Sequence, residues 1–207
     1  MAISKGEFVA VEFEGSIKID GHVFDKTDKP KTICIGAGWL LEGIDSALME
    51  KNIGDEFELD LAPEKAFGQR NPSMMKLTST NKFRDFKPIA GIQVNVDGVL
   101  ATVKSVSGGR VVLDFNHPLA GKALHYKIKI IKKIEDLKEK IKAVVDILLP
   151  DVDIVVVEKS VTIKMKTKLP DALNNNMKKE IEKFVPEVKD FEFKFDVLEK
   201  KEEEKTN

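Results

Sequence analysis

The residue types that most often carry covalent or metal chemistry are scarce in this chain and widely spaced. The 207 residues include one cysteine, Cys34, and three histidines, His22, His117 and His125. One cysteine cannot form an internal disulfide, and the separation of the histidines does not match the ligand spacing of a zinc site. We therefore expect no metal, no cofactor and no internal disulfide, and we read His117 as a structural residue.

One acidic residue is notable because of its neighbour. Asp25 directly follows Phe24 at the end of an expected strand. An acid in that place is either a turn residue or a polar group beside an apolar pocket. Other aromatic and aliphatic residues recur at strand and helix spacing, and such residues belong to a core more often than to a binding site. The residues alone leave both interpretations open.

Short strands and one short helix must position these side chains. Residues 7–19 alternate apolar and polar side chains and predict a strand, and residues 32–35 and 57–61 predict two more. Between the last two, the apolar spacing over residues 40–48 predicts a short amphipathic helix. Its apolar face is expected to lie across the sheet.

A change of pattern between residues 73 and 117 indicates an inserted module. Short alternating runs are separated there by Pro and Gly turn signals. Strand character resumes over residues 124–131, with apolar side chains on one face. We expect that strand to join the first sheet, so that residues 73–117 form a small antiparallel module within it.

A further domain is expected over residues 134–199, where charge density rises while the apolar residues stay periodic. The predicted order is α-β-β-α-β, followed by a charged tail over residues 200–207. The aromatic residues within 191–195 and the four consecutive apolar residues of 154–157 exceed what two short helices cover easily. Either this domain pairs with a second copy, or both helices complete a monomeric core.

The charge balance and the apolar runs limit the classes of partner. The 34 basic and 35 acidic side chains nearly cancel, so no electrostatic argument favours nucleic acid or an anionic membrane. Lys164, Lys166 and Lys168 alternate on one predicted strand face and keep RNA binding open as an alternative, although such a row is usually a solvated face. No apolar run approaches the roughly 20 residues that span a bilayer. We expect a cytoplasmic protein.

Three stretches, taken in order, resemble the FKBP family of peptidyl-prolyl cis/trans isomerases. They are DGHVFDKT (20–27), IGAGWLLEGIDSALMEKNIGDEFEL (35–59) and PEKAFG (63–68). The string NHPLAGKAL (116–124) resembles the junction in SlyD-type members, where an insert interrupts the flap. Beyond about residue 132 the chain is similar to long archaeal members only in having an extra domain.

The resemblance implies an α+β fold and an isomerase activity. Residues 1–72 and 118–133 would form an antiparallel FKBP sheet wrapped on a short helix, with the β module of residues 73–117 inserted in the flap. Rotation about an X-Pro bond must cross a barrier of about 18–20 kcal/mol because amide resonance is lost. No bond is made or broken, so the catalyst requires only a pocket more complementary to the twisted amide than to the planar forms.

The resemblance also implies the residues of that pocket. The catalytic residues are Asp25, Tyr126 and Phe67. The substrate-binding residues are Phe13, Phe24, Leu40, Leu41, Ile44 and Trp39. Trp39 is either a contact at the pocket mouth or an ordinary exposed aromatic, and the backbone N–H of Leu41 would hold a substrate carbonyl. Phe13 and Ile44 replace the Tyr and Trp of drug-binding eukaryotic members, so tight macrolide binding is not expected.

The insert carries more apolar residues than so small a module buries with ease. The residues expected to bind unfolded chain are Met74, Met75, Leu77, Phe86 and Ile89. Phe83 and Ile92 are expected in the insert's own core. The leading interpretation is a folding catalyst that acts on unfolded polypeptides with X-Pro bonds and holds them through the insert. The alternative is a non-catalytic holdase or adaptor that binds unfolded chains.

Overall fold

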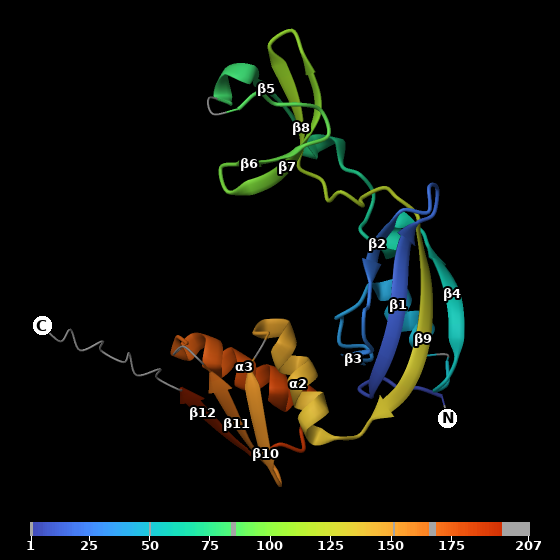
Figure 1. Ribbon diagram of the computed structural model, residues 1–207, viewed down its shortest axis with the longest axis vertical. Coiled ribbons are helices and arrows are strands. Elements are labelled where there is room, and N and C mark those ends of the chain that lie inside the picture. The colour runs from blue at the N-terminus through green and yellow to red at the C-terminus, as the bar shows by residue number, and fades with distance from the viewer. Residues whose placement is uncertain (1, 50, 84–85, 151, 166–168, 196–207) are drawn as a thin grey trace, which may run out of the picture.

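The computed structural model describes residues 2–49, 51–83, 86–150, 152–165 and 169–195. Within these ranges the chain has a mixed α+β fold with three α-helices and three sheets. The three sheets are set apart from one another (Figure 1). The predicted α+β class is confirmed.

The first sheet has the order β2-β1-β9-β4, and β3 also pairs with β1. Its strands are β1 (Phe8–Ile17), β2 (Val23–Lys26), β3 (Lys31–Cys34), β4 (Glu56–Leu61) and β9 (Leu124–Ile134). Every pairing is antiparallel. The central strand β9 comes from beyond the second sheet and closes the first one between β1 and β4.

Helix α1 (Glu42–Leu48) lies on one face of this sheet. The inward residues of β9 alternate with exposed lysines, and Ile128 and Ile130 pack in one buried cluster with Ile44 and Leu48 of the helix. Each such aliphatic side chain contributes about 1.5–3 kcal/mol when fully buried. Strand β9 and helix α1 therefore stabilise each other by packing their apolar faces together.

The second sheet has the order β5-β8-β7-β6. Its strands are β5 (Met75–Ser79), β6 (Gln93–Val96), β7 (Val99–Ser107) and β8 (Arg110–Asp114). Phe83 packs against the small core of this sheet, as expected, but the prediction for Ile92 is wrong because 36% of this residue is exposed. Ile92 lies in the turn ahead of β6, where Val94 takes the inward position.

The third sheet has the order β10-β11-β12, with an antiparallel first pair and a parallel second pair. The elements are α2 (Leu137–Leu148), β10 (Asp153–Val157), β11 (Ser160–Met165), α3 (Asp171–Phe184) and β12 (Asp190–Phe195). Asp136 caps α2, because its Oδ1 accepts from the Glu139 N–H at 2.8 Å. Parallel pairing of β11 with β12 requires the crossover that α3 supplies.

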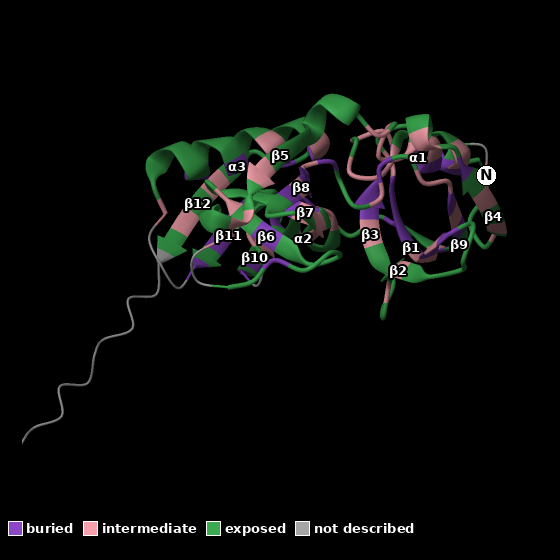
Figure 2. Ribbon diagram, turned by 90° about the horizontal axis from the view of Figure 1, so that it is seen from above, coloured by how far each residue is buried: buried purple, intermediate pink, exposed green. Residues whose placement is uncertain are grey.

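The helices of this last segment pack on the first sheet. Phe8 and Cys34 belong to the same buried cluster as Ile141 and Ile181 of α2 and α3. Seen from two directions, this segment and the second sheet both project from the same side of the first sheet (Figures 1 and 2). The domain boundaries at residues 73, 117 and 134 stay predictions.

The sequence predicts that residues 154–157 are covered on both faces, but the described part of this chain covers one face. Ile154 is buried, but Val155 and Val157 are exposed on the other face of β10. Lys166, Lys168 and the charged tail lie outside the described residues. None of the helices in the described ranges is long and apolar enough to cross a membrane.

Candidate active site

Tyr126 and two other aromatic residues, each from a different strand of the first sheet, form a cluster. The Tyr126 ring of β9 lies 5.9 Å from the Phe24 ring of β2 and 6.3 Å from the Phe13 ring of β1, measured between centroids. The Phe24 contact is edge to face, a favoured aromatic geometry. Leu40, Leu41 and Phe67 are partly buried and pack against the same core as these rings. The structure therefore brings most of the predicted pocket residues together.

The close packing of these rings depends on Gly15 of β1. A Cβ at this position would lie 2.7 Å from Cε1 of Tyr126 and 3.1 Å from Cζ of Phe24. The absence of a side chain lets both rings lie directly over the strand. Gly15 was not among the residues predicted for the pocket, although a glycine inside a strand is a usual signal of a close approach.

The Tyr126 hydroxyl is protonated and available to a ligand. Burial, with a smaller contribution from the nearby Asp25 carboxylate, raises the pKa of Tyr126 to about 12. Only 3% of Tyr126 is exposed, whereas Asp25 is exposed at the end of β2. Within the described residues the hydroxyl has no hydrogen-bond partner, so it can donate to a group that enters the pocket.

The loop before α1 is held by a buried acid that our sequence analysis also missed. Asp45 accepts from the backbone N–H of Gly36 at 3.1 Å and from that of Gly38 at 3.3 Å. Leu41 is the N-cap, and its carbonyl accepts from the Ile44 N–H at 2.9 Å. The Leu41 N–H itself has no acceptor in the described part of the chain. It is a second donor beside the aromatic cluster.

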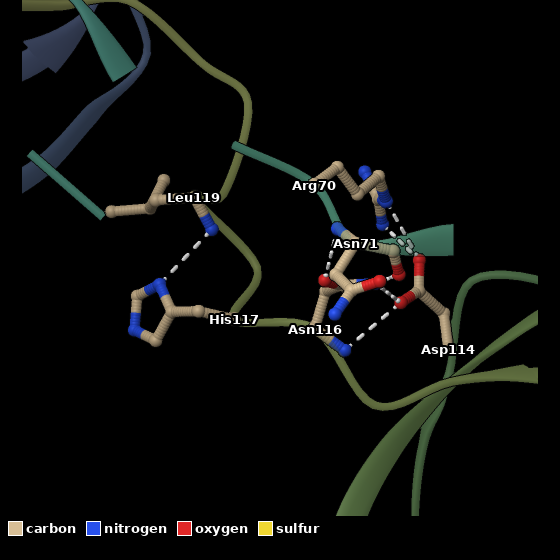
Figure 3. Close-up of polar contacts among 6 residues, drawn as sticks. All are labelled: Arg70, Asn71, Asp114, Asn116, His117 and Leu119. Atoms are coloured by element: carbon tan, nitrogen blue, oxygen red, sulfur yellow. Dashed lines mark hydrogen bonds and ion pairs between the residues drawn. The ribbon is translucent and has the colours of Figure 1, made fainter. Parts of the chain in front are cut away.

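Phe67 is supported by a histidine from the junction with the second sheet. The Phe67 and His117 rings are stacked, with centroids 4.2 Å apart and planes 6° from parallel. The Leu119 N–H donates to Nδ1 of His117 at 3.2 Å (Figure 3), which fixes the orientation of the imidazole. This contact agrees with the reading of His117 as a structural residue.

A network of polar contacts joins the two chain segments that lead to the second sheet (Figure 3). The side chain of Asp114 is fully buried, and its Oδ2 accepts from Nε of Arg70 at 2.9 Å. Its Oδ1 accepts from the Asn116 backbone N–H at 2.9 Å and side-chain amide at 2.8 Å. Burial opposes ionisation, but the Asn116 and Arg70 donors outweigh it and lower the pKa of Asp114.

The same network fixes the backbone of both segments. The Asn71 N–H donates to Oδ1 of Asn116 at 2.8 Å, and Nδ2 of Asn116 donates to the Asn71 carbonyl at 3.0 Å. The segments that enter and leave the second sheet are therefore tied directly to each other. The buried, ionised carboxylate of Asp114 is tolerated because Arg70 supplies an opposite charge and Asn116 supplies further hydrogen-bond donors.

Two groups of predicted residues lie away from the aromatic cluster. Trp39 is half-buried and stacks edge to face on Phe8 at 6.0 Å and on Phe184 at 5.3 Å between centroids. It therefore lies at the contact between the first sheet and α3. The five residues expected to bind unfolded chain are exposed on or beside the second sheet: Met74, Met75, Leu77, Phe86 and Ile89. In the described ranges, no three His, Cys, Asp or Glu side chains group as metal ligands.

Comparison with known proteins identifies the family. The model of the FKBP26 IF domain matches residues 79–119. The short-type peptidyl-prolyl cis-trans isomerase of Methanocaldococcus jannaschii is 32% identical over 146 residues, which cover 62% of this chain and 92% of that protein. The FKBP-type 16 kDa isomerase of Escherichia coli is 30% identical, over 63% of this chain and 93% of that protein.

SlyD of Helicobacter pylori, an FKBP-type isomerase, is 29% identical over 64% of this chain and 76% of that protein. These relatives are matched over most of their own length, and each leaves about a third of this chain without a counterpart. The similarity agrees with the motifs that carry the resemblance. This chain belongs to the FKBP-type peptidyl-prolyl cis/trans isomerases.

Proposed function

We propose that this chain catalyses cis/trans isomerisation of X-Pro bonds in unfolded polypeptides. The observation that carries the proposal is the aromatic cluster around Tyr126, whose protonated hydroxyl has no partner among the described residues. Phe24, Phe67 and Leu41 supply the apolar walls, and Asp25 is the polar group at the rim.

The mechanism follows from the electronic change during rotation. Twisting the amide removes its resonance, so the twisted form is less polar than either planar form. An apolar pocket that excludes water favours that form. The Tyr126 hydroxyl and the Leu41 N–H then position the substrate by donating to its carbonyl groups, and fixed donors of this kind need no reorganisation during the reaction. The roles of these residues are part of the proposal.

The second sheet is proposed to hold the client while the pocket acts. Its exposed apolar residues, among them Leu77 and Ile89, suit contacts with varied unfolded sequences. The Arg70–Asp114 network ties this sheet to the segment behind Phe67, so a captured chain stays near the pocket. Tethering of this kind raises the effective concentration of X-Pro bonds at the site.

The test compares a short substrate with a protein substrate. Wild-type protein should accelerate isomerisation of an X-Pro tetrapeptide and proline-limited refolding of a model protein. A Leu77→Asp, Ile89→Asp double variant should keep the first activity and lose most of the second. Ile19→Asp is the matched control, since Ile19 is an exposed apolar residue in the turn after β1. No acceleration on either substrate, with aggregation still suppressed, would establish the holdase alternative.

A homodimer through the C-terminal segment is a further part of the proposal. In the part of the chain that the structure describes, the edge strand β10 pairs with β11 alone and exposes Val155 and Val157. A second copy would cover both. Val157→Lys should therefore lower the sedimentation coefficient, whereas Leu173→Lys, at an exposed position of α3, should not. The cytoplasmic location expected from the sequence stays a prediction.

A further inference from the structure

A groove of about 1030 Å³ lies between strand β3 and helix α2. This is at the upper end of the volumes typical of ligand sites. Its apolar lining includes Ile33 from β3, Trp39 and Leu40 from the loop before α1, and Ala143 and Ile147 from α2. Helix α2 approaches strand β3 where the groove lies (Figure 1).

One wall of the groove is a strand edge with unused backbone groups. Among the described residues, strand β3 pairs with β1 alone. In an antiparallel pair, opposed residues alternate between those that exchange hydrogen bonds and those that do not. The Ile35 N–H donates to the Glu7 carbonyl, so the opposed residues Glu7 and Ile35 are hydrogen-bonded. By the alternation along the two strands, Thr32 and its partner Ala10 are opposed without exchanging hydrogen bonds. The N–H and carbonyl of Thr32 therefore point away from β1, and Thr32 lines the groove.

The loop before α1 connects the groove with the core of the candidate active site. Leu40 lines the groove and also packs against the core that includes Tyr126. The next residue, Leu41, carries the N–H donor proposed to hold a substrate carbonyl. A polypeptide that leaves the pocket past Leu41 therefore meets Leu40 and then the free edge of β3.

The charges around the groove are balanced. Three basic side chains face three acidic ones around it: Lys31, Lys138, Lys142, Asp136, Glu139 and Asp146. Lys142 and Asp146 form an ion pair of 2.6 Å between Nζ and Oδ1. A balanced rim over an apolar floor disfavours a highly charged polymer and suits an uncharged, extended chain.

We infer that this groove binds the extended segment of the client next to the isomerised proline, as an added strand on the free edge of β3. The inference rests on the proposed isomerase function, which it deepens by naming a second substrate subsite. Strand addition gains backbone hydrogen bonds without demanding a sequence, while alternate side chains enter the apolar floor. This combination fits a catalyst of many clients.

The test uses full-length protein and three matched peptides. One is an X-Pro tetrapeptide, and the others extend it by six uncharged residues before or after that core. At least one extension should lower KM by about tenfold, and N-methylation of alternate extension residues should abolish the gain because it removes strand hydrogen bonds. Turnover of the tetrapeptide is the internal measure of the isomerase function itself.

Adjacent residues of α2 provide a matched pair of variants. Ile147 is 49% exposed and lines the groove, whereas Leu148 is 41% exposed and does not. Ile147→Asp should remove most of the tenfold gain and leave tetrapeptide kinetics unchanged, and Leu148→Asp should behave as wild type. Ala143→Trp, which fills the groove instead of making it polar, should act like Ile147→Asp.

Trp39 supplies a second readout that does not depend on activity. It is the chain's one tryptophan and lines the groove, so binding there should change its emission. The extended peptide should shift the emission of wild type and of Leu148→Asp, but not of Ile147→Asp. Peptide held only by the second sheet would leave the emission unchanged.

Three results would overturn the inference. The first is that the extended peptides have the KM of the tetrapeptide and leave Trp39 emission unchanged. The second is that Ile147→Asp and Leu148→Asp have equal effects. The third is that Ile147→Asp changes the sedimentation coefficient, which would place a second copy in the groove. If wild type fails to isomerise the tetrapeptide but the extended peptide still shifts Trp39 emission, the proposed isomerase function fails and the groove stands as a binding site.

Discussion

Replacing Gly15 by alanine is the sharpest test of the proposed pocket. The new Cβ would lie 2.7 Å from Cε1 and 2.9 Å from Cζ of Tyr126. Carbon atoms in contact prefer separations of about 3.5–4.0 Å. The Tyr126 ring must therefore shift by roughly 1 Å, and it must do so within a buried cluster that offers little free space.

The expected effects differ in size for stability and for activity. Overpacking by one methyl group costs about 1–3 kcal/mol of the free energy of unfolding. A displacement of about 1 Å in a group that positions the substrate can cost about 100-fold in rate. We therefore expect Gly15→Ala to remain folded at 25 °C and to lose about 10- to 100-fold in kcat/KM for an X-Pro tetrapeptide.

The assay pairs tetrapeptide kinetics with urea denaturation. Gly54→Ala is the control, since Gly54 has a φ of 92° and open space around its Cα. This substitution strains the backbone by about 1 kcal/mol without displacing a ring. It should lose stability and keep full activity. If Gly15→Ala matches Gly54→Ala in activity as well as stability, Tyr126 and Phe24 do not form the catalytic pocket.

Three further predictions follow from the site. The pKa of Tyr126 is raised to about 12, so its contribution to the free energy of unfolding is complete below about pH 10 and is lost between pH 10 and 12. Urea denaturation of the wild type should show a loss of about 2–3 kcal/mol over this range, and Tyr126→Phe should not show it. Asp45→Asn leaves one of two backbone N–H groups unpaired and should cost about 1–3 kcal/mol, with a raised KM; an unchanged KM would show that Asp45 does not position Leu41. Burial raises the pKa of Cys34 to about 11, so iodoacetamide at pH 8 should label it only in denaturant.

The local elements could be predicted from the sequence because each has a strict apolar period. The alternation over residues 124–131 corresponds to β9, and the stripe over residues 40–48 corresponds to α1. The helix begins two residues later than the stripe because Leu41 is its N-cap, with a φ of -59° and a ψ of 141° that lie outside the helical region, and Leu40 precedes it in the loop. That loop depends on Asp45, whose two backbone contacts leave no trace in a hydrophobic pattern.

Contacts between distant segments could not be predicted in this way. Trp39 was placed at the pocket mouth or on the surface because nothing near it in sequence indicates a partner. Its partner is Phe184, at the end of α3. The Arg70–Asp114 pair was missed for the same reason, since an arginine and an aspartate so far apart have no pattern that links them.

Two uninterrupted apolar runs nevertheless carry information about long-range cover. Residues 8–11 of β1 are all buried, with Phe8 in the cluster shared with α2 and α3 and Val9 in the cluster shared with α1. A continuous run therefore marks a strand covered on both faces. The run 154–157 in β10 has the same character, but the described chain covers only the face of Ile154. Because residues 8–11 of β1 are covered on both faces, we expect a second chain to cover the exposed face of β10, and this is the physical reason to test for a dimer there.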